Sequence, residues 1–530
     1  MAVKRYAAIK DNTITNAFKE NLVLRGTGSN MGASDILEVF SIYGQNNFSS
    51  SASGDNTRTS ELSRVLLEFP VSGSSVGQIY GDRVNDKIPA SGSVNFFLKV
   101  FNARHSETVP TNITLNIQAI SASWNEGDGL DMENYSDKGK SNWISRNSSS
   151  DWLEPGGDFH TASYESGTNF PMYTTTLEEG IEDIELDITS MVEEWIAGRE
   201  TAHRQNYGIA VYLTSDQEAF LSSSSGLTSG SIPHNPGGAT RSYYTKRFFA
   251  RGSQFFFKRP IIEARWDSSK KDDRSNFYLS SSLAPASDNL NSLYLYNNIK
   301  GQLKDIGGNS STLPVLKLYS GNTSAPGTTQ LTLKHAATNA DITSVTSTRI
   351  STGIYSASFA LTSSSDTTYV WDVWEVGGAE VHTGSVFIEP KPLNAASVNS
   401  FTNYRTKITN LKSEYSTDEK ANFRVFIRAK DWSPTIYTVA SAEPENTIVE
   451  DAYFKLFRVQ DSFDIINYGT GSTQHTRLSH DISGSYFDLD MSILEPDYMY
   501  GIKFLYKVND DYQEQPEVFK FRIVEKDELQ

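Results

Sequence analysis

The chain has 530 residues, a formal net charge of −17, 38% hydrophobic and 12% aromatic residues, and no cysteine. The absence of cysteine excludes disulfide bonds, thiolate metal sites and cysteine nucleophiles. The acidic balance argues against binding nucleic acid through its phosphates, because that requires a basic face. The aromatic content is too high for a disordered chain.

The length predicts three or four domains, at roughly 100–200 residues per domain. Apolar runs are short, such as Phe255–Phe257, so we expect no membrane-spanning segment and no membrane partner. Residues 1–20 lack the uninterrupted apolar core of a signal peptide, so we expect the chain to fold in the cytoplasm.

Short segments rich in β-branched and aromatic residues dominate the first region, residues 1–270, and predict strands. One segment, Ile188–Ala197, instead has apolar residues at helical spacing, with Gly198 as its end. Ser/Gly/Asn/Thr clusters between the segments predict turns. The strands are expected at Val94–Phe101, Thr114–Ala119, Tyr207–Leu213 and Pro260–Trp266, and the turns at Asn46–Thr59, Asn147–Ser150 and Ser222–Gly238.

Two further regions follow, residues 271–392 and 393–530. The charged run Asp267–Arg274 is interpreted as a linker or an exposed corner, and Glu389–Pro392 as a stiff linker, because proline cannot donate to a ladder. Expected strands are Leu293–Tyr296, Leu313–Tyr319, Ile354–Leu361, Tyr369–Val376 and Ser385–Ile388, with a turn at Ser363–Thr367, and then Phe423–Ile427, Val518–Val524 and segments near Tyr453, Tyr486 and Tyr500.

Each of these two regions has the length and strand count of an immunoglobulin-like sandwich. Neither has the Cys…Trp…Cys spacing of true immunoglobulin domains, so the likeness is one of architecture. The sequence therefore predicts an all-β protein in which an N-terminal β-sandwich is followed by two immunoglobulin-like β-sandwiches.

Basic and aromatic residues alternate along Arg241–Arg265. This stretch is compatible with a nucleic-acid groove, but we favour a strand pair whose basic side chains face outward toward an acidic neighbouring subunit. The basic residues are Arg241, Lys246, Arg247, Arg251, Lys258, Arg259 and Arg265.

An ordered set of motifs over residues 10–215 resembles DNRLRE-type domains. The motifs are Asn30–Ser34 (NMGAS), Leu37 with Val39, Ser63–Phe69 (SRVLLEF), Trp124–Gly127 (WNEG), Trp143, Trp152, Gly156–Asp158 (GGD), Leu186–Thr189 (LDIT), Trp195 with Gly198, and Asn206–Gly208 (NYG). The resemblance implies a jelly-roll sandwich related to carbohydrate-binding modules, found as a non-catalytic module in surface and secreted proteins. The segment from Ser222 to Trp266 adds about fifty residues to that pattern.

The matched positions have physical roles as structural residues. Arg64 could cross-brace a sheet through its five donors, Gly208 permits a tight strand entry, and Trp195 could cover one end of the core. The expected structural signature is Arg64, Phe69, Trp124, Trp195, Gly198, Asn206, Tyr207 and Gly208. If the module binds glycans, Trp143 and Trp152 are the candidate platform, with their rings exposed.

Catalytic motifs are missing: the sequence has no nucleophile elbow, phosphate-binding loop or H-E-x-x-H. His475 and His480 are close in sequence and are expected on the surface. The acidic, glycine-containing loop Glu126–Glu133 is a weak Ca²⁺ candidate; otherwise no cofactor or metal is expected. A glycosidase would need two carboxyl groups roughly 5–9.5 Å apart, and no pair in the sequence can be singled out.

A second resemblance concerns the whole chain. A cysteine-free acidic protein with a Ser/Thr/Asn-rich jelly roll and immunoglobulin-like tails is similar to virion proteins of tailed bacteriophages, and Ser29–Gly44 and Tyr243–Trp266 resemble structural proteins of myophages. The expected function is a non-enzymatic decoration, collar, neck or tail-associated subunit, localised in the virion. Its expected partners are copies of itself and other virion proteins. The alternatives are a glycan- or receptor-binding surface module and a polysaccharide hydrolase.

Overall fold

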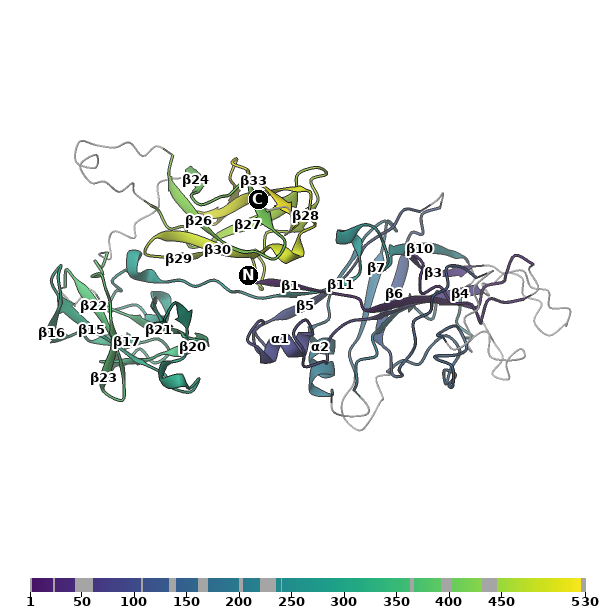
Figure 1. Ribbon diagram of the computed structural model, residues 1–530, viewed down its shortest axis with the longest axis horizontal. Helices are drawn as coiled ribbons and strands as arrows, with labels where there is room; N and C mark the ends of the chain where they lie inside the picture. The colour runs from purple at the N-terminus through teal and green to yellow at the C-terminus, as the bar shows by residue number, and fades with distance from the viewer. Residues whose placement is uncertain are drawn as a thin grey trace. The chain divides into compact units, whose positions relative to one another are not determined.

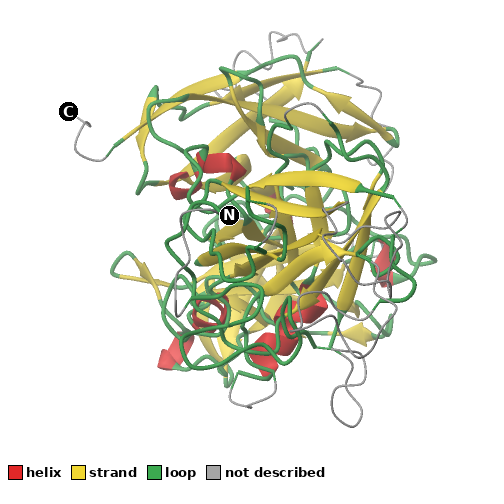
Figure 2. Ribbon diagram, turned by 90° about the vertical axis from the view of Figure 1, so that its right-hand side faces the viewer, coloured by secondary structure: helices red, strands yellow, loops and turns green. Residues whose placement is uncertain are grey.

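The structure, a computed structural model, is all-β: the chain is 44% strand and 7% helix, which confirms the predicted fold class. Strands dominate both views (Figure 1, Figure 2). The described residues are 2–21, 24–42, 61–105, 108–132, 140–160, 170–199, 204–219, 235–239, 241–362, 367–391, 403–430 and 446–525. The predicted turn Asn46–Thr59, and residues 222–234 and 363–366 of two other predicted turns, lie outside this part of the chain.

The chain divides into two compact units. One unit is Val3–Trp266, and the other contains Asp267–Gln530. The division therefore falls at the end of the strand predicted at Pro260–Trp266 and before the charged run that follows it. No helix in the described residues is long and apolar enough to cross a membrane.

The first unit is a jelly-roll sandwich of two antiparallel sheets (Figure 1). The four-stranded sheet has the order β1 (Val3–Ala7), β11 (Ile261–Arg265), β5 (Asn95–Val100), β8 (Ile184–Asp187). The seven-stranded sheet has the order β10 (Tyr243–Phe249), β3 (Ile36–Ile42), β4 (Glu61–Glu68), β9 (Ile209–Leu213), β6 (Ile113–Ala119), β7 (Met172–Leu177), with β2 (Lys10–Thr15) paired to β4.

Alternation of apolar side chains explains these strands. In β5, Phe96, Leu98 and Val100 are buried while the residues between them are half-buried, as expected for a strand with one face in a core. Strand β4 is buried along almost its whole length. Because successive side chains point to opposite faces, both faces of β4 must be covered.

Within the described residues, two α-helices accompany the jelly roll, α1 (Ile79–Val84) and α2 (Thr189–Ala197). The helix predicted at Ile188–Ala197 is thus confirmed, and Gly198 follows it as predicted. Its apolar side chains are buried, in agreement with the spacing: Ile188, Met191, Val192, Trp195 and Ile196.

The second unit contains two sandwiches. The first has two five-stranded sheets and a short hairpin, and its core includes Leu316, Leu318, Tyr355, Phe359 and Trp374. One sheet contains β12 (Asn291–Tyr296), β21 (Ile354–Ala360), β17 (Leu333–His335), β18 (Asp341–Ile342) and β20 (Thr348–Ser351); the other contains β16 (Pro326–Gln330), β15 (Val315–Gly321), β22 (Val370–Val376), β23 (Ala379–Thr383) and β19 (Val345–Thr346); the hairpin is β13 (Asn298–Ile299) and β14 (Gln302–Leu303).

The other sandwich of this unit has a four-stranded and a six-stranded sheet. Its core is aromatic: Phe487 stacks on Phe423 and on Phe454, with ring centroids 5.1 and 4.3 Å apart. The sheets are β24 (Tyr404–Ile408), β26 (Lys420–Ala429), β30 (Gly484–Asp490), β29 (Ser479–Asp481), and β25 (Glu414–Ser416), β33 (Phe519–Val524), β31 (Met499–Val508), β27 (Ala452–Arg458), β28 (Asp464–Ile466) with β32 (Asp511–Glu514). Both sandwiches are immunoglobulin-like, as predicted.

The predicted strands coincide with observed ones, with one exception. Ser385–Ile388 forms no strand: only Ile388 pairs, through an isolated bridge with Val370. Within the predicted stiff linker Glu389–Pro392, Lys391 pairs in parallel with Tyr278. Residues 392–402 lie outside the described chain.

Candidate functional site

Arg64 is the centre of a buried polar cluster on the seven-stranded sheet. Its guanidinium donates to both carboxylate oxygens of Glu218, at 2.8 and 2.7 Å, and to the Gly156 carbonyl at 3.0 Å. The guanidinium carbon also lies 4.9 Å from the ring centroid of Tyr212 and 5.4 Å from that of Trp143. Arg64 therefore connects β4 to two segments distant in sequence, residues 143–156 and 212–218, as its donors suggested.

Arg64 stays charged in this cluster, and the backbone at Gly156 leaves room for its side chain. Burial alone would lower the pKa of Arg64, but the Glu218 carboxylate outweighs it, so the pKa is raised and Arg64 stays charged. Gly156 has φ +94°, and an added Cβ would lie 2.9 Å from both the Arg64 guanidinium and the Trp143 ring. A glycine is required there because the backbone approaches both side chains closely.

The glycan-platform prediction for Trp143 and Trp152 is wrong. Their exposed fractions are 0% and 5%, and both belong to a core cluster with Leu62, Leu66 and Trp124. Since Leu62, Arg64 and Leu66 alternate along β4, they share one face of the sheet, and the tryptophan-bearing segments cover that face. A buried ring cannot stack on a sugar.

Five of the expected signature residues meet at one point, although they come from three stretches of sequence. The Asn206 amide donates to the Phe69 carbonyl at 2.7 Å and accepts from the Gly208 amide at 3.0 Å. The Trp124 indole donates to the Tyr207 carbonyl at 2.8 Å. This arrangement ties the entry of β9 to the end of β4 and has a structural role.

The remaining two signature residues belong to helix α2 and its C-terminal end. Trp195 is fully buried on α2, 6.2 Å from the Phe170 ring centroid. Gly198 accommodates the Arg204 side chain, which an added Cβ would meet at 2.0 Å.

The basic stretch Arg241–Arg265 is partly neutralised inside its own unit. Lys246 is fully buried, donates to Asn102 Oδ1 at 2.6 Å, and has a pKa lowered by burial to about 8. The prediction of outward-facing basic side chains is therefore wrong for Lys246. Other members are paired: Arg247 with Glu38, Arg251 with Glu126, and Arg265 with Glu263 and Glu185.

The acidic loop at Glu126 is also engaged. Glu126 accepts from the Asp11 backbone amide at 2.7 Å and pairs with Arg251 at 2.8 Å. Burial raises the pKa of Asp11 to about 7, and the Glu126 charge adds to this. Glu133 lies outside the described residues, within which no group of three or more His, Asp or Glu could hold a metal ion.

A second polar cluster, which the sequence analysis missed, joins the two immunoglobulin-like sandwiches. It is built on residues 270–276, here called the junction segment, which includes the short 3-10 helix η2 (Asp273–Ser275). The segment pairs with strand β29: the Asp272 amide donates to the His480 carbonyl, and the His480 amide donates to the Lys270 carbonyl, both at 3.0 Å. The charged run is therefore not an exposed corner from Lys270 on, while its start at Asp267 coincides with the division between the two units.

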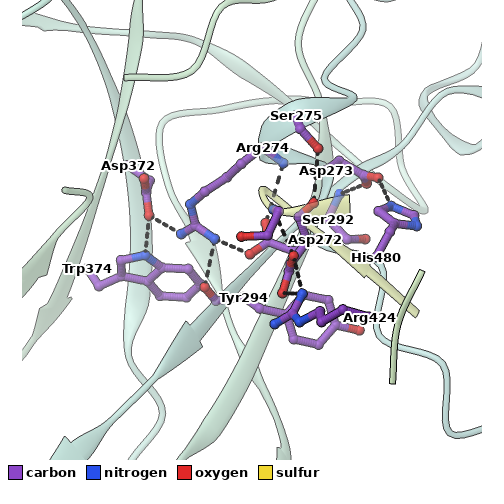
Figure 3. Close-up of polar contacts among 12 residues, drawn as sticks. Asp272, Asp273, Arg274, Ser275, Ser292, Tyr294, Asp372, Trp374, Arg424 and His480 are labelled. Carbon is purple, nitrogen blue, oxygen red and sulfur yellow. Dashed lines mark hydrogen bonds and ion pairs between the residues drawn. The ribbon is translucent and has the colours of Figure 1, made fainter. Parts of the chain in front are cut away.

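Arg274 anchors the junction segment to the first sandwich (Figure 3). Its guanidinium pairs with Asp272 and, at 2.5 Å, with Asp372, and it donates to the Tyr294 carbonyl at 3.0 Å. Asp372 in turn accepts from the Trp374 indole at 2.8 Å. Two carboxylates thus share one guanidinium.

Burial raises the pKa of one carboxyl group in this cluster. Asp272 is 5% exposed, and burial is the main reason that its pKa is raised to about 6. Arg274 opposes this effect, while the Asp372 charge adds to it. Asp372 is itself fully buried, and its second oxygen has no hydrogen-bond partner among the described residues.

Asp273 connects both sandwiches. One carboxylate oxygen accepts from the Ser292 amide at 2.7 Å in the first sandwich, and the other lies 3.0 Å from His480 Nε2 in the second. His480 is 3% and His475 9% exposed, so the prediction that they are surface residues is wrong. No local pattern marks Asp273 and His480 as partners, since 207 positions separate them.

No protein family and no curated protein matches the chain. Among solved structures it is similar to a crystal structure of domains A168-A170 from titin, with 10% sequence identity and a TM-score of 0.13 over 47% of this chain. The chain spans 64% of the length of that structure. The sandwich folds are identified from the sheets of this chain itself.

Proposed function

We propose that this chain is a non-enzymatic virion structural protein of a tailed bacteriophage, a decoration, collar, neck or tail-associated subunit that acts by packing and oligomerisation. The observation that carries the proposal is the junction segment. Asp273 and Arg274 connect the two sandwiches through buried charged contacts. Such contacts are expected in a protein that must hold two modules at a fixed spacing. A flexible pair of binding modules has no need of such contacts.

The construction of the first unit supports the same role. Arg64 and Glu218 brace the jelly roll from within, and Glu263 is paired with Arg5 and Arg265. In a chain without cysteine, such buried ion pairs and core area provide the order that disulfides supply elsewhere. The resemblance to DNRLRE-type modules and to phage virion proteins agrees with a non-catalytic subunit.

Particles of the phage that encodes the chain provide the direct test. We expect mass spectrometry of gradient-purified particles to find the chain at a fixed copy number. We also expect light scattering after gel filtration to give a closed homo-oligomer for the recombinant chain. A stable monomer that hydrolyses a polysaccharide, or absence of the chain from the particles, would overturn the proposal.

A further inference from the structure

A cleft of about 560 Å³ lies between the two immunoglobulin-like sandwiches of the second unit. This volume is within the roughly 300–1,000 Å³ typical of small-molecule sites. The first sandwich contributes one wall, including Asn276, Tyr278, Asn289 and Lys391, and the second contributes the other, including Asn446, Thr447, Glu450, Asp451, Lys507 and Asn509.

The first wall of the cleft is held by backbone pairing. Lys391 lies beside Tyr278 in a parallel bridge, in which the Leu279 amide donates to the Lys391 carbonyl at 3.0 Å and the Lys391 amide to the Phe277 carbonyl at 2.8 Å. On the opposite wall, the Lys507 amide donates to the Asp451 carbonyl at 2.9 Å. Together with the junction segment, these bonds preform the cleft, which lowers the entropic cost of binding.

Polar side chains already connect the two walls. The Lys391 ammonium donates to Asn276 Oδ1 at 3.0 Å, and the Asn276 amide donates to Glu450 Oε1 at 3.4 Å. Glu450 is exposed. This series of hydrogen bonds fixes the positions of donors and acceptors along the cleft.

Other polar groups in the cleft are available to a ligand. Within the described part of the protein, the side-chain amides of Asn289 and Asn509 and the hydroxyl of Thr447 make no hydrogen bond to protein. An amide offers two donors and one acceptor oxygen. Groups that both donate and accept match a ligand whose groups also do both, as hydroxyl groups do.

Charge narrows the ligand class further. The two lysines of the lining, Lys391 and Lys507, are matched in number by Glu450 and Asp451. Lys507 and Asp451 also have ion-pair partners outside the lining, Asp510 and Arg477, so the cleft does not favour a phosphate or another strong anion. Tyr278 adds a half-buried aromatic ring, with the Lys391 ammonium 5.1 Å from its centroid. This ring provides an apolar surface beside the polar groups. A neutral molecule with many hydroxyl groups and apolar C–H faces fits all of these features.

We propose that the cleft between the two immunoglobulin-like sandwiches binds a neutral oligosaccharide, such as the end of a surface glycan. The amides of Asn289 and Asn509 and the Glu450 carboxylate hydrogen-bond its hydroxyl groups, and the Tyr278 ring packs against a sugar face. This binding activity is distinct from the packing function proposed above and does not depend on it.

Saturation-transfer NMR with the full-length chain tests the site, with maltotriose, chitobiose, lactose and isomaltotriose as probes. Inorganic phosphate, which has no C–H proton to report transfer, is titrated by calorimetry as a charged comparison. We expect transfer to at least one saccharide and no binding of phosphate. Titration calorimetry with the responding saccharide should show affinity falling by roughly two- to tenfold in Asn289→Ala, as loss of one or two hydrogen bonds implies, and by a similar or larger factor in Tyr278→Ala.

Matched controls keep the result interpretable. Asn298 and Tyr244 are exposed and do not line the cleft, so Asn298→Ala and Tyr244→Ala should bind as the unsubstituted chain does. Circular dichroism checks that every variant is folded. Failure of all four saccharides to bind, a preference for phosphate, or equal affinity in the cleft and control variants would overturn the proposal, and none of these outcomes would affect the oligomer test.

Discussion

The Arg64–Glu218 pair is the clearest case in which single residues decide stability. Both side chains are less than a tenth exposed, so removing one leaves the other charge buried without its partner. We expect Arg64→Ala and Glu218→Ala each to lower the free energy of unfolding by about 3–5 kcal/mol. Urea denaturation at pH 7 measures this change.

The double variant Arg64→Met with Glu218→Leu gives the matching control. It removes both charges and retains apolar volume, so it should cost less than the sum of the two single substitutions. Lys412→Ala, at an exposed pair with Glu419, should leave the free energy of unfolding nearly unchanged, because water screens the pair. Equally small losses in the free energy of unfolding at the Arg64–Glu218 and Lys412–Glu419 pairs would contradict the structural role of the Arg64 cluster.

Gly208 tests the backbone at the entry of β9. Its φ is +91°, and an added Cβ would lie 2.0 Å from the Leu67 carbonyl oxygen. Gly208→Ala should therefore destabilise the jelly roll by about 1–3 kcal/mol or more, because it adds strain and a backbone clash. Gly28→Ala has open space and should change thermal stability little; a similar melting temperature for both variants would refute this reading.

At the scale of the element, the stability of the junction segment should depend on pH because Asp272 titrates. Its pKa is about 6 when folded and 3.8 in its unperturbed state, so the folded state binds the proton more tightly. Stability contributed by this group is therefore full below pH 4 and is lost as pH rises through 6. Between these two pH values the contribution of Asp272 to the free energy of unfolding falls by on the order of 1–3 kcal/mol.

Calorimetric melting between pH 4.5 and 7.5 measures this dependence. The unsubstituted chain should lose stability relative to Asp272→Asn as pH rises, because the asparagine carries no charge at any pH in this range. Asp288→Asn, at an exposed position, should leave the pH dependence unchanged. If the curves for the unsubstituted chain and Asp272→Asn run parallel, Asp272 is not the titrating group.

At the scale of the whole molecule, Asp273 couples the two immunoglobulin-like sandwiches through Ser292 and His480. We expect Asp273→Ala to loosen this connection, since hydrogen bonds to a charged group contribute roughly 1.5–3 kcal/mol each. Small-angle X-ray scattering should then show a broader distance distribution, with faster proteolysis in residues 267–276. Asp341→Ala, at an exposed pair, should scatter as the unsubstituted chain does, and identical profiles for all three proteins would count against the coupling.

Local pattern was sufficient to predict the secondary structure and the class of fold. Strands such as β5 and β26, and the helix α2, are marked by the spacing of apolar residues within a few positions of one another. The need of Arg64 for a braced, buried environment was also foreseeable, because an arginine inside an apolar strand must find partners for its donors. The predicted architecture of sandwiches follows from these local signals.

Only the tertiary structure decided which side chains meet. Trp143 and Trp152 are buried because loops cover the outer face of β4, and His480 is buried because the junction segment pairs with β29. These contacts join residues far apart in the chain, such as Asp273 and His480 at a separation of 207 positions. Burial and pairing at such distances depend on how the sheets and loops assemble, and no periodicity within a strand or helix encodes that assembly.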